Sequence, residues 1–330
     1  MTSRAVTAFV EYNGILEGFL RGQLFFSAVE AELFSVLDEP RDAEEVARFT
    51  GWRVSAVESI LEALSVQGWI ERVEGHPGGR WVNGTEARRF LSRHSDESMA
   101  ELLSFQRRTM GLDGLAGLAS AEERPGCGPC DFAAMARAKS VELRLFRQRP
   151  CVDEARRLFD ADAPLSVLDC GGGSGLLALA LAGAFPRCRA TVFETPAVAP
   201  VARQFVEREG MEDRVRVRSG DFLVDPLGGP WDLIVASGIL EFAGDGLDAF
   251  LRKLRDSLAL GGKMMVYSTA FGEGGLGRGA LRWLSGCLRA GRAIRRHCGD
   301  LTAALNEAGF ETIRSTDDGL YPLRIFERRE

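Results

Sequence analysis

The chain has 330 residues, of which 45% are hydrophobic, and a net charge of −6 at pH 7. This length is enough for two domains with ordinary hydrophobic cores. Acidic and basic residues are interspersed, so no basic face suggests nucleic acid, and no apolar stretch is long enough to span a bilayer. The amino terminus lacks a signal-peptide pattern and the seven cysteines are an odd number, which predicts a reducing, cytoplasmic location.

The first hundred residues predict a winged-helix unit. Amphipathic helices are expected within 4–37, and Asp42 lies where it would cap a helix with an acidic first turn. A further helix over 54–64 is followed by two short strands, 68–73 and 79–82, on either side of a His-Pro-Gly turn. Helix, turn, helix and a two-stranded wing is the order of a winged helix.

Winged helices often bind DNA, so this function has to be weighed. The second helix of the pair would enter the major groove and would need Arg, Lys, Asn or Gln on its exposed face. It carries Glu58, Glu62, Ser55 and Ser59 instead, with Arg53 nearby. Acidic side chains repel phosphates, and we therefore predict no nucleic-acid partner.

The connecting region contains a loop rich in glycine and proline at 123–130, between helices expected over 99–110 and 131–146. Cys127 and Cys130 in this loop have a spacing that suits redox chemistry or half of a zinc site. No second pair completes a zinc set, and an active redox pair begins a helix in its own fold. We therefore predict no metal site and treat these thiols as incidental.

The most informative stretch is Leu-Ser-Val-Leu-Asp-Cys-Gly-Gly-Gly-Ser-Gly at 165–175. It predicts a strand and a tight turn, and the apolar stretch 176–185 predicts the helix that follows. Asp169 stands at the carboxyl end of the strand, where open α/β sheets bind ligands. The glycines at Gly171 and Gly173 allow a ligand to approach the backbone where a Cβ would clash.

Further strands alternate with helices along the rest of the chain. They are expected over 189–194, 215–220, 231–237 and 263–269, with a helix over 247–260 that ends at a glycine pair. This alternation predicts a parallel sheet in a doubly wound, Rossmann-like α/β domain. Glu194 lies roughly 20 residues beyond the glycine turn, the spacing at which a carboxylate binds the ribose hydroxyls of an adenosine ligand.

In these motifs the chain resembles the class I S-adenosylmethionine-dependent methyltransferases. It resembles more narrowly the two-domain small-molecule O-methyltransferases of the hydroxyindole and plant-phenol type. The matching stretches are 168–175, 192–196, 214–215, 220–222 and 258–263, together with 26–34 and 82–91 near the amino terminus. The resemblance implies a dimerisation domain over 1–97, a helical connector over 98–160 that lines the acceptor pocket, and a methyltransferase domain over 161–330.

The resemblance implies S-adenosylmethionine as the cofactor and a second copy of the chain as the partner. The candidate cofactor-binding residues are Asp169, Gly171, Gly173, Glu194, Asp221, Phe222 and Ser237. Gly171 and Gly173 would lie beside the cofactor's amino acid moiety, Asp221 and Phe222 at its adenine, and Ser237 near the methyl donor. The alternatives are a solvated strand-end acid for Glu194, a helix cap for Asp221 and a core residue for Phe222.

The acceptor is expected to be a small, largely apolar molecule. In relatives the connecting region lines the acceptor pocket, and Met110, Phe132 and Met135 could supply an apolar wall in this chain. The alternative is that these side chains are part of the core between domains.

The catalytic base is the main departure from the family. Relatives carry a histidine after the fourth strand in a Leu-His-Asp-Trp pattern, whereas this chain has Leu-Glu-Phe-Ala at 240–243. Three alternatives follow: Glu241 is the base, His297 just before the helix over 301–308 is the base, or no strong base is needed.

The leading prediction for the function is O-methylation of a small aromatic natural product. The alternatives are C-methylation of a tetrapyrrole or polyketide-like ring and a non-enzymatic cofactor-binding regulator.

Overall fold

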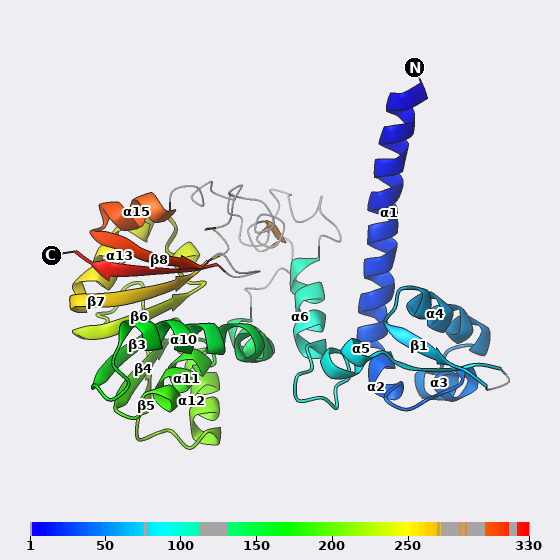
Figure 1. Ribbon diagram of the computed structural model, residues 1–330, viewed down its shortest axis with the longest axis horizontal. Coiled ribbons are helices and arrows are strands. Elements are labelled where there is room, and N and C mark those ends of the chain that lie inside the picture. The colour runs from blue at the N-terminus through cyan, green and yellow to red at the C-terminus, as the bar shows by residue number, and fades with distance from the viewer. Residues whose placement is uncertain are drawn as a thin grey trace. The chain divides into compact units, whose positions relative to one another are not determined.

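The computed structural model describes residues 2–75, 78–111, 131–268, 271, 284–285, 288, 301–316 and 322–329. The chain divides into two compact units, Met1–Arg108 and Thr109–Glu330 (Figure 1). Within the described ranges, no helix has both the length and the apolar character that crossing a membrane requires.

The first unit begins with a long helix, α1 (Thr2–Glu30), drawn in dark blue in Figure 1. Its last turn packs into the core through Ala28 and Val29, which are almost fully buried. The rest of α1 exposes large apolar side chains, namely Val6, Phe9, Val10, Tyr12, Ile15, Leu16, Phe19 and Leu20. The described residues of the first unit therefore leave the apolar surface of α1 largely uncovered.

The remainder of the first unit has the order that the sequence predicts. Its elements are α2 (Leu33–Val36), α3 (Ala43–Thr50), α4 (Val54–Val66), β1 (Ile70–Val73), β2 (Arg80–Asn83), α5 (Thr85–Phe90) and α6 (Ala100–Met110). Asp42 caps α3: its carboxylate accepts from the Glu45 amide at 2.8 Å, and the Glu45 carboxylate accepts from the Asp42 amide at 3.0 Å. Strands β1 and β2 pair antiparallel.

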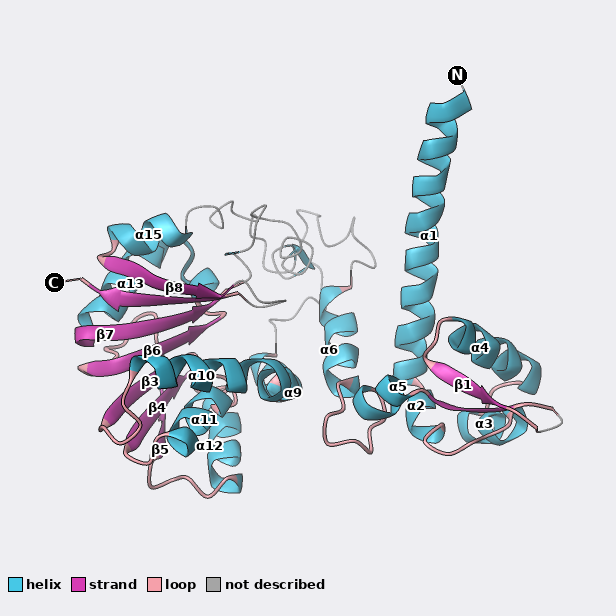
Figure 2. Ribbon diagram, in the orientation of Figure 1, coloured by secondary structure: helices cyan, strands magenta, loops and turns pink. Residues whose placement is uncertain are grey.

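The second unit is built on a seven-stranded sheet, shown in magenta at the left of Figure 2. Its strands are β3 (Leu165–Cys170), β4 (Cys188–Glu194), β5 (Val215–Ser219), β6 (Trp231–Ser237), β7 (Leu258–Tyr267), β8 (Phe310–Thr316) and β9 (Leu323–Arg328). They lie in the order β5-β4-β3-β6-β7-β9-β8. The first five are parallel, and β9 runs antiparallel to both β7 and β8. This confirms the predicted Rossmann-like α/β domain.

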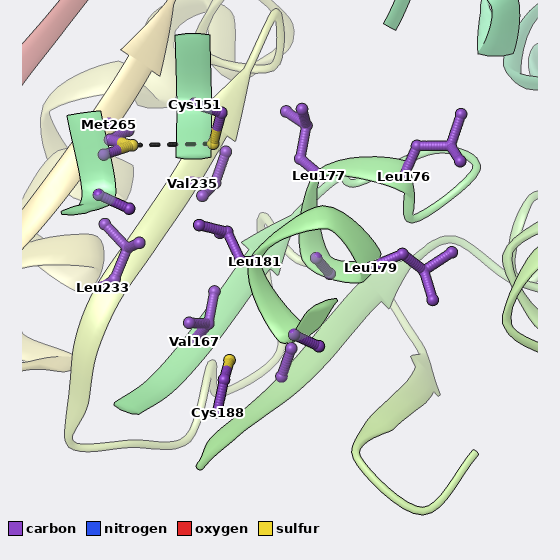
Figure 3. Packing of buried hydrophobic residues seen from close by; sticks show 14 of the residues in the cluster. Cys151, Val167, Leu176, Leu177, Leu179, Leu181, Cys188, Leu233, Val235 and Met265 are labelled. Carbon is purple, nitrogen blue, oxygen red and sulfur yellow. Dashed lines mark hydrogen bonds between the residues drawn. The ribbon is translucent and has the colours of Figure 1, made fainter. Parts of the chain in front are cut away.

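Helices cover both faces of this sheet. They are α8 (Phe132–Ala138), α9 (Ser140–Glu142), the π-helix η1 (Leu143–Arg147), α10 (Gln148–Leu158), α11 (Leu176–Ala184), α12 (Ala199–Arg208), the 3₁₀ helix η2 (Leu240–Gly246), α13 (Leu247–Asp256) and α15 (Leu301–Glu307). One core joins the sheet to α10, α11 and α12, and the other joins it to α13 and α15. Neighbouring residues of β3 alternate between them, since Val167 packs in the first and Leu168 in the second. Figure 3 shows part of the first core.

The predicted helix over 247–260 is wrong at its carboxyl end. Helix α13 stops at Asp256, and β7 begins at Leu258 rather than at residue 263. Trp231 pairs with Leu258 but Leu233 pairs with Lys263, so residues 259–262 form a bulge. A Cβ on Gly262 would lie 2.9 Å from the Ala259 carbonyl oxygen. The glycine pair therefore serves a β-bulge and not a helix cap.

Candidate active site

The carboxyl ends of β3, β4 and β6 meet at one edge of the sheet. The chain leaves β3 for β4 and β5 on one side and then crosses back to β6 on the other side of β3. Open α/β sheets bind ligands at such a reversal, because the connecting loops diverge there and leave a crevice. The glycine turn follows β3 directly, Glu194 ends β4 and Ser237 ends β6.

The glycine turn has a backbone that side chains would disrupt. Gly171 and Gly173 have φ values of +63° and +60°, which L-residues rarely adopt. A Cβ on Gly171 would lie 2.4 Å from Cγ2 of Ile239, whereas a Cβ on Gly173 would meet nothing closer than Ala136 at 3.8 Å. The turn is thus packed tightly on Ile239, while its backbone at Gly173 is left open to a ligand.

Asp169 lies fully buried beneath this turn. Its Oδ2 accepts a hydrogen bond from the Ala178 amide at 3.3 Å, and no group of the described residues donates to Oδ1. Burial raises the pKa of Asp169 from 3.8 to about 7; the Ala178 hydrogen bond opposes this, and the negative charge of Glu194 adds to it. The Ser174 hydroxyl is also buried without a partner in the described chain. Buried polar atoms are normally paired, so each of these two atoms is left with an unused capacity for a hydrogen bond.

Glu194 is tied to the glycine turn. Its Oε1 accepts from the Gly173 amide at 3.0 Å, and its Oε2 accepts from the Thr195 amide at 2.7 Å. The residue is buried, and burial raises the pKa of its carboxyl group, while these hydrogen bonds oppose the rise. Glu194 is therefore not a solvated strand-end acid, and its contact with ribose hydroxyls stays a prediction.

Asp221 and Phe222 both have local structural roles. Oδ1 of the exposed Asp221 accepts from the Leu223 amide at 2.9 Å, which is a turn-capping contact. Phe222 is buried in the second core, and its ring lies 6.2 Å from that of Phe250. A Cβ on Gly171 would lie 3.4 Å from this ring, so Phe222 borders the glycine turn. Their adenine contacts remain predictions.

Ser237 is held by a residue that sequence reasoning missed, Arg147. Nη1 of Arg147 donates to the Ser237 hydroxyl at 2.6 Å, and Nη2 donates to Glu142 at 2.9 Å. Both charged side chains are buried, and the Tyr267 ring lies 5.7 Å from the guanidinium carbon. Glu142 and Arg147 are five residues apart and meet across the π-helix η1. In an α-helix this spacing does not bring side chains together, so the sequence carries no signal for the pair.

Glu241 lies in η2, directly after β6. Its Oε1 accepts from the Ser268 hydroxyl at 2.5 Å, and its Oε2 is buried with no donor among the described residues. The next residue, Phe242, packs edge-on against Phe132, with ring centroids 5.6 Å apart. Sequence reasoning missed Ser268, because the two segments meet only in the folded sheet.

The other predicted acceptor residues are placed as follows. Phe132 is 39% exposed and Met135 is half-buried on the same helix, α8. Met110 is half-buried at the end of α6, beside Thr109 and Gly111, whose carbonyl oxygens accept hydrogen bonds from Ser285. The structure thus brings Phe132 to the Glu241 segment. Roles in acceptor binding stay predictions for all three.

His297, Cys127 and Cys130 lie outside the described residues. Within the described residues, no cluster of His, Cys, Asp or Glu could hold a metal.

Comparisons with known proteins point to one family. Residues 138–311 match the family described as O-methyltransferase domain. Acetylserotonin O-methyltransferase of Mus musculus is 30% identical over 323 residues, covering 91% of this chain and 83% of that protein. The N,N-dimethyltransferase OxyT of Streptomyces rimosus is 29% identical over 284 residues, 81% of each. Human N-acetylserotonin methyltransferase, solved with S-adenosylmethionine, has the same fold, with a TM-score of 0.74 and 22% identity over the full length of both chains. The chain belongs to the O-methyltransferase family.

Proposed function

We propose that this enzyme transfers a methyl group from S-adenosylmethionine to a hydroxyl of a small aromatic natural product or biosynthetic intermediate. The observation that carries the proposal is the glycine turn at the reversal of strand order, flanked by two buried carboxylates, Asp169 and Glu194. The family match and the relatives that act on small molecules support it.

The residues at this edge fit the cofactor. The open backbone at Gly173 suits its amino acid moiety, as do the buried atoms Asp169 Oδ1 and Ser174 Oγ, which have no partner among the described residues. A carboxylate only accepts hydrogen bonds, so Glu194 suits the two donor hydroxyls of a ribose. When bound, the cofactor supplies a methyl carbon that is already activated and a neutral leaving group.

The chain's own residues have two tasks in this reaction. The first is to align the acceptor with the methyl carbon, since an in-line displacement depends strongly on orientation. The second is to take the hydroxyl proton. Glu241 would do this through Oε2, a buried oxygen without a donor among the described residues. His297 and transfer without a protein base remain the alternatives.

The exposed apolar side chains of α1 support a homodimer. Phe9, Ile15 and Phe19 are each more than half exposed, and contiguous apolar surface of this kind marks an interaction site. We infer that a second copy covers α1, with residues 1–97 acting as a winged-helix dimerisation domain in a cytoplasmic enzyme. An obligate interface of this kind buries several thousand Å².

The function is tested with methyl-labelled S-adenosylmethionine and a panel of aromatic hydroxyl compounds that includes acetylserotonin. We expect a labelled methyl ether, and Glu241→Gln should lower turnover by ~10²–10⁴-fold, the usual contribution of one acid–base group. Asp248→Asn, which changes an exposed carboxylate shortly after η2, is the matched control and should be active. A ring-methylated product would favour C-methylation, and cofactor binding without transfer to any pathway compound would favour the regulator.

A further inference from the structure

Glu241 and Ser268 form a hydrogen-bonded pair at the carboxyl ends of two neighbouring strands. Glu241 follows β6, and Ser268 is the residue after the last residue of β7, which pairs with β6 up to Ser237↔Tyr267. The Ser268 hydroxyl is almost fully buried and donates to Glu241 Oε1 at 2.5 Å. The Ser268 amide donates to the Pro322 carbonyl oxygen at 3.3 Å. Ser268 is thus fixed by the sheet, and it fixes one oxygen of the carboxylate in turn.

The two oxygens of Glu241 have different environments. Oε1 is paired, whereas Oε2 is buried with no donor among the described residues. A buried oxygen of a charged group without a hydrogen bond is costly. A bound molecule with a polar hydrogen would supply the hydrogen bond that this oxygen lacks.

The residue after Glu241 in the sequence belongs to an aromatic pair. Phe242 follows Glu241 directly, and its ring meets that of Phe132 edge-on at 78°. Phe132 is 39% exposed although it is a large apolar residue. Aromatic rings of a ligand pack favourably against such exposed faces and edges. A flat aromatic molecule with a polar hydrogen matches both features of this segment.

We propose that Ser268 is a positioning residue that holds Glu241 Oε1, so that Oε2 receives a hydrogen bond from the acceptor. The acceptor is then an aromatic compound whose O–H donates to Oε2, and its methyl ether is bound poorly. This inference rests on the proposed function and names the substrate class of the same site. It also explains how a chain without the family's histidine can select a hydroxyl.

The test compares each hydroxyl compound with its own methyl ether. The full-length protein is saturated with S-adenosylhomocysteine, and binding is measured for two pairs: acetylserotonin with its O-methyl ether, and para-cresol with para-methylanisole. We expect the hydroxyl member to bind roughly 10–100-fold more tightly, the usual effect of a hydrogen bond to a charged group. Glu241→Ala and Ser268→Ala should each lower this preference to below about threefold, and Ser268→Thr, which keeps the hydroxyl, should retain it.

Two controls separate this inference from general damage and from the proposed function. Asp248→Asn and Ser59→Ala change exposed side chains of the same types and should keep the preference. If Ser268→Ala does not fold, Ser268→Cys replaces it, because a thiol is a weak donor. A wild-type protein without preference in either pair, or a preference that survives both Glu241→Ala and Ser268→Ala, would overturn the inference. Failure of the wild-type protein to bind S-adenosylhomocysteine would instead contradict the proposed function.

Discussion

Replacing Asp169 with asparagine tests the electrostatics beneath the glycine turn. Asparagine keeps the shape of the side chain and an oxygen for the Ala178 amide, but it carries no charge. Burial raises the pKa of Asp169 from 3.8 to about 7. Between these pH values the folded protein holds a proton that the unfolded chain has released, so the stability falls as the pH rises. The cost of burying the ionised carboxylate is complete above about pH 7 and absent below about pH 4.

The size of this effect follows from the pKa difference. The interval from 3.8 to about 7 is about 3 pH units, and each unit corresponds to about 1.4 kcal/mol. The free energy of unfolding of Asp169→Asn relative to wild type should therefore increase by up to ~4 kcal/mol from acidic to neutral pH. The variant gains relative stability at neutral pH because it no longer buries a charge.

The assay is urea denaturation of the cofactor-free protein at a series of pH values, with Asp248→Asn as the control. This control removes one carboxylate charge at an exposed position. A stability difference for Asp169→Asn that is constant with pH, or that decreases as the pH rises, would contradict a raised pKa for Asp169. Asp169 would then be ionised in the folded protein throughout this range.

Two further predictions concern the buried ion pair and the first helix. Arg147→Met leaves the buried Glu142 without its cation and should lower the free energy of unfolding by roughly 3–5 kcal/mol. In thermal denaturation, the double variant with Glu142→Gln should recover part of this loss. Full additivity of the two substitutions would argue against a coupled pair. The exposed apolar face of α1 predicts a dimer in light scattering at micromolar concentration, whereas a stable monomer would contradict the homodimer.

The features that the sequence predicted well are those that lie close together in it. The stretch 165–175 contains the strand, the turn and the acid of the proposed cofactor site in eleven consecutive residues. Glu194 follows at a spacing set by one helix and one strand, and the structure brings it to the Gly173 amide. The alternation of strands and helices likewise predicted the parallel part of the sheet.

The features that the sequence did not predict depend on tertiary structure. Ser268 reaches Glu241 because β6 and β7 are neighbours in the sheet. Arg147 meets Glu142 across a π-helix, where the α-helical spacing rule does not apply. The bulge at 259–262 depends on strand pairing with Trp231, which a helix-cap rule applied to a glycine pair does not take into account.

Calorimetric titration with S-adenosylhomocysteine measures whether the glycine turn and Glu194 bind S-adenosylmethionine, as we propose. We predict micromolar binding to the wild-type protein and no preference for NAD. Glu194→Ala should weaken binding at least tenfold, equivalent to about 1.4 kcal/mol or more, because the carboxylate at the end of β4 is lost. Tight NAD binding, or S-adenosylhomocysteine binding that Glu194→Ala leaves unchanged, would contradict binding of the cofactor by Glu194 and the glycine turn.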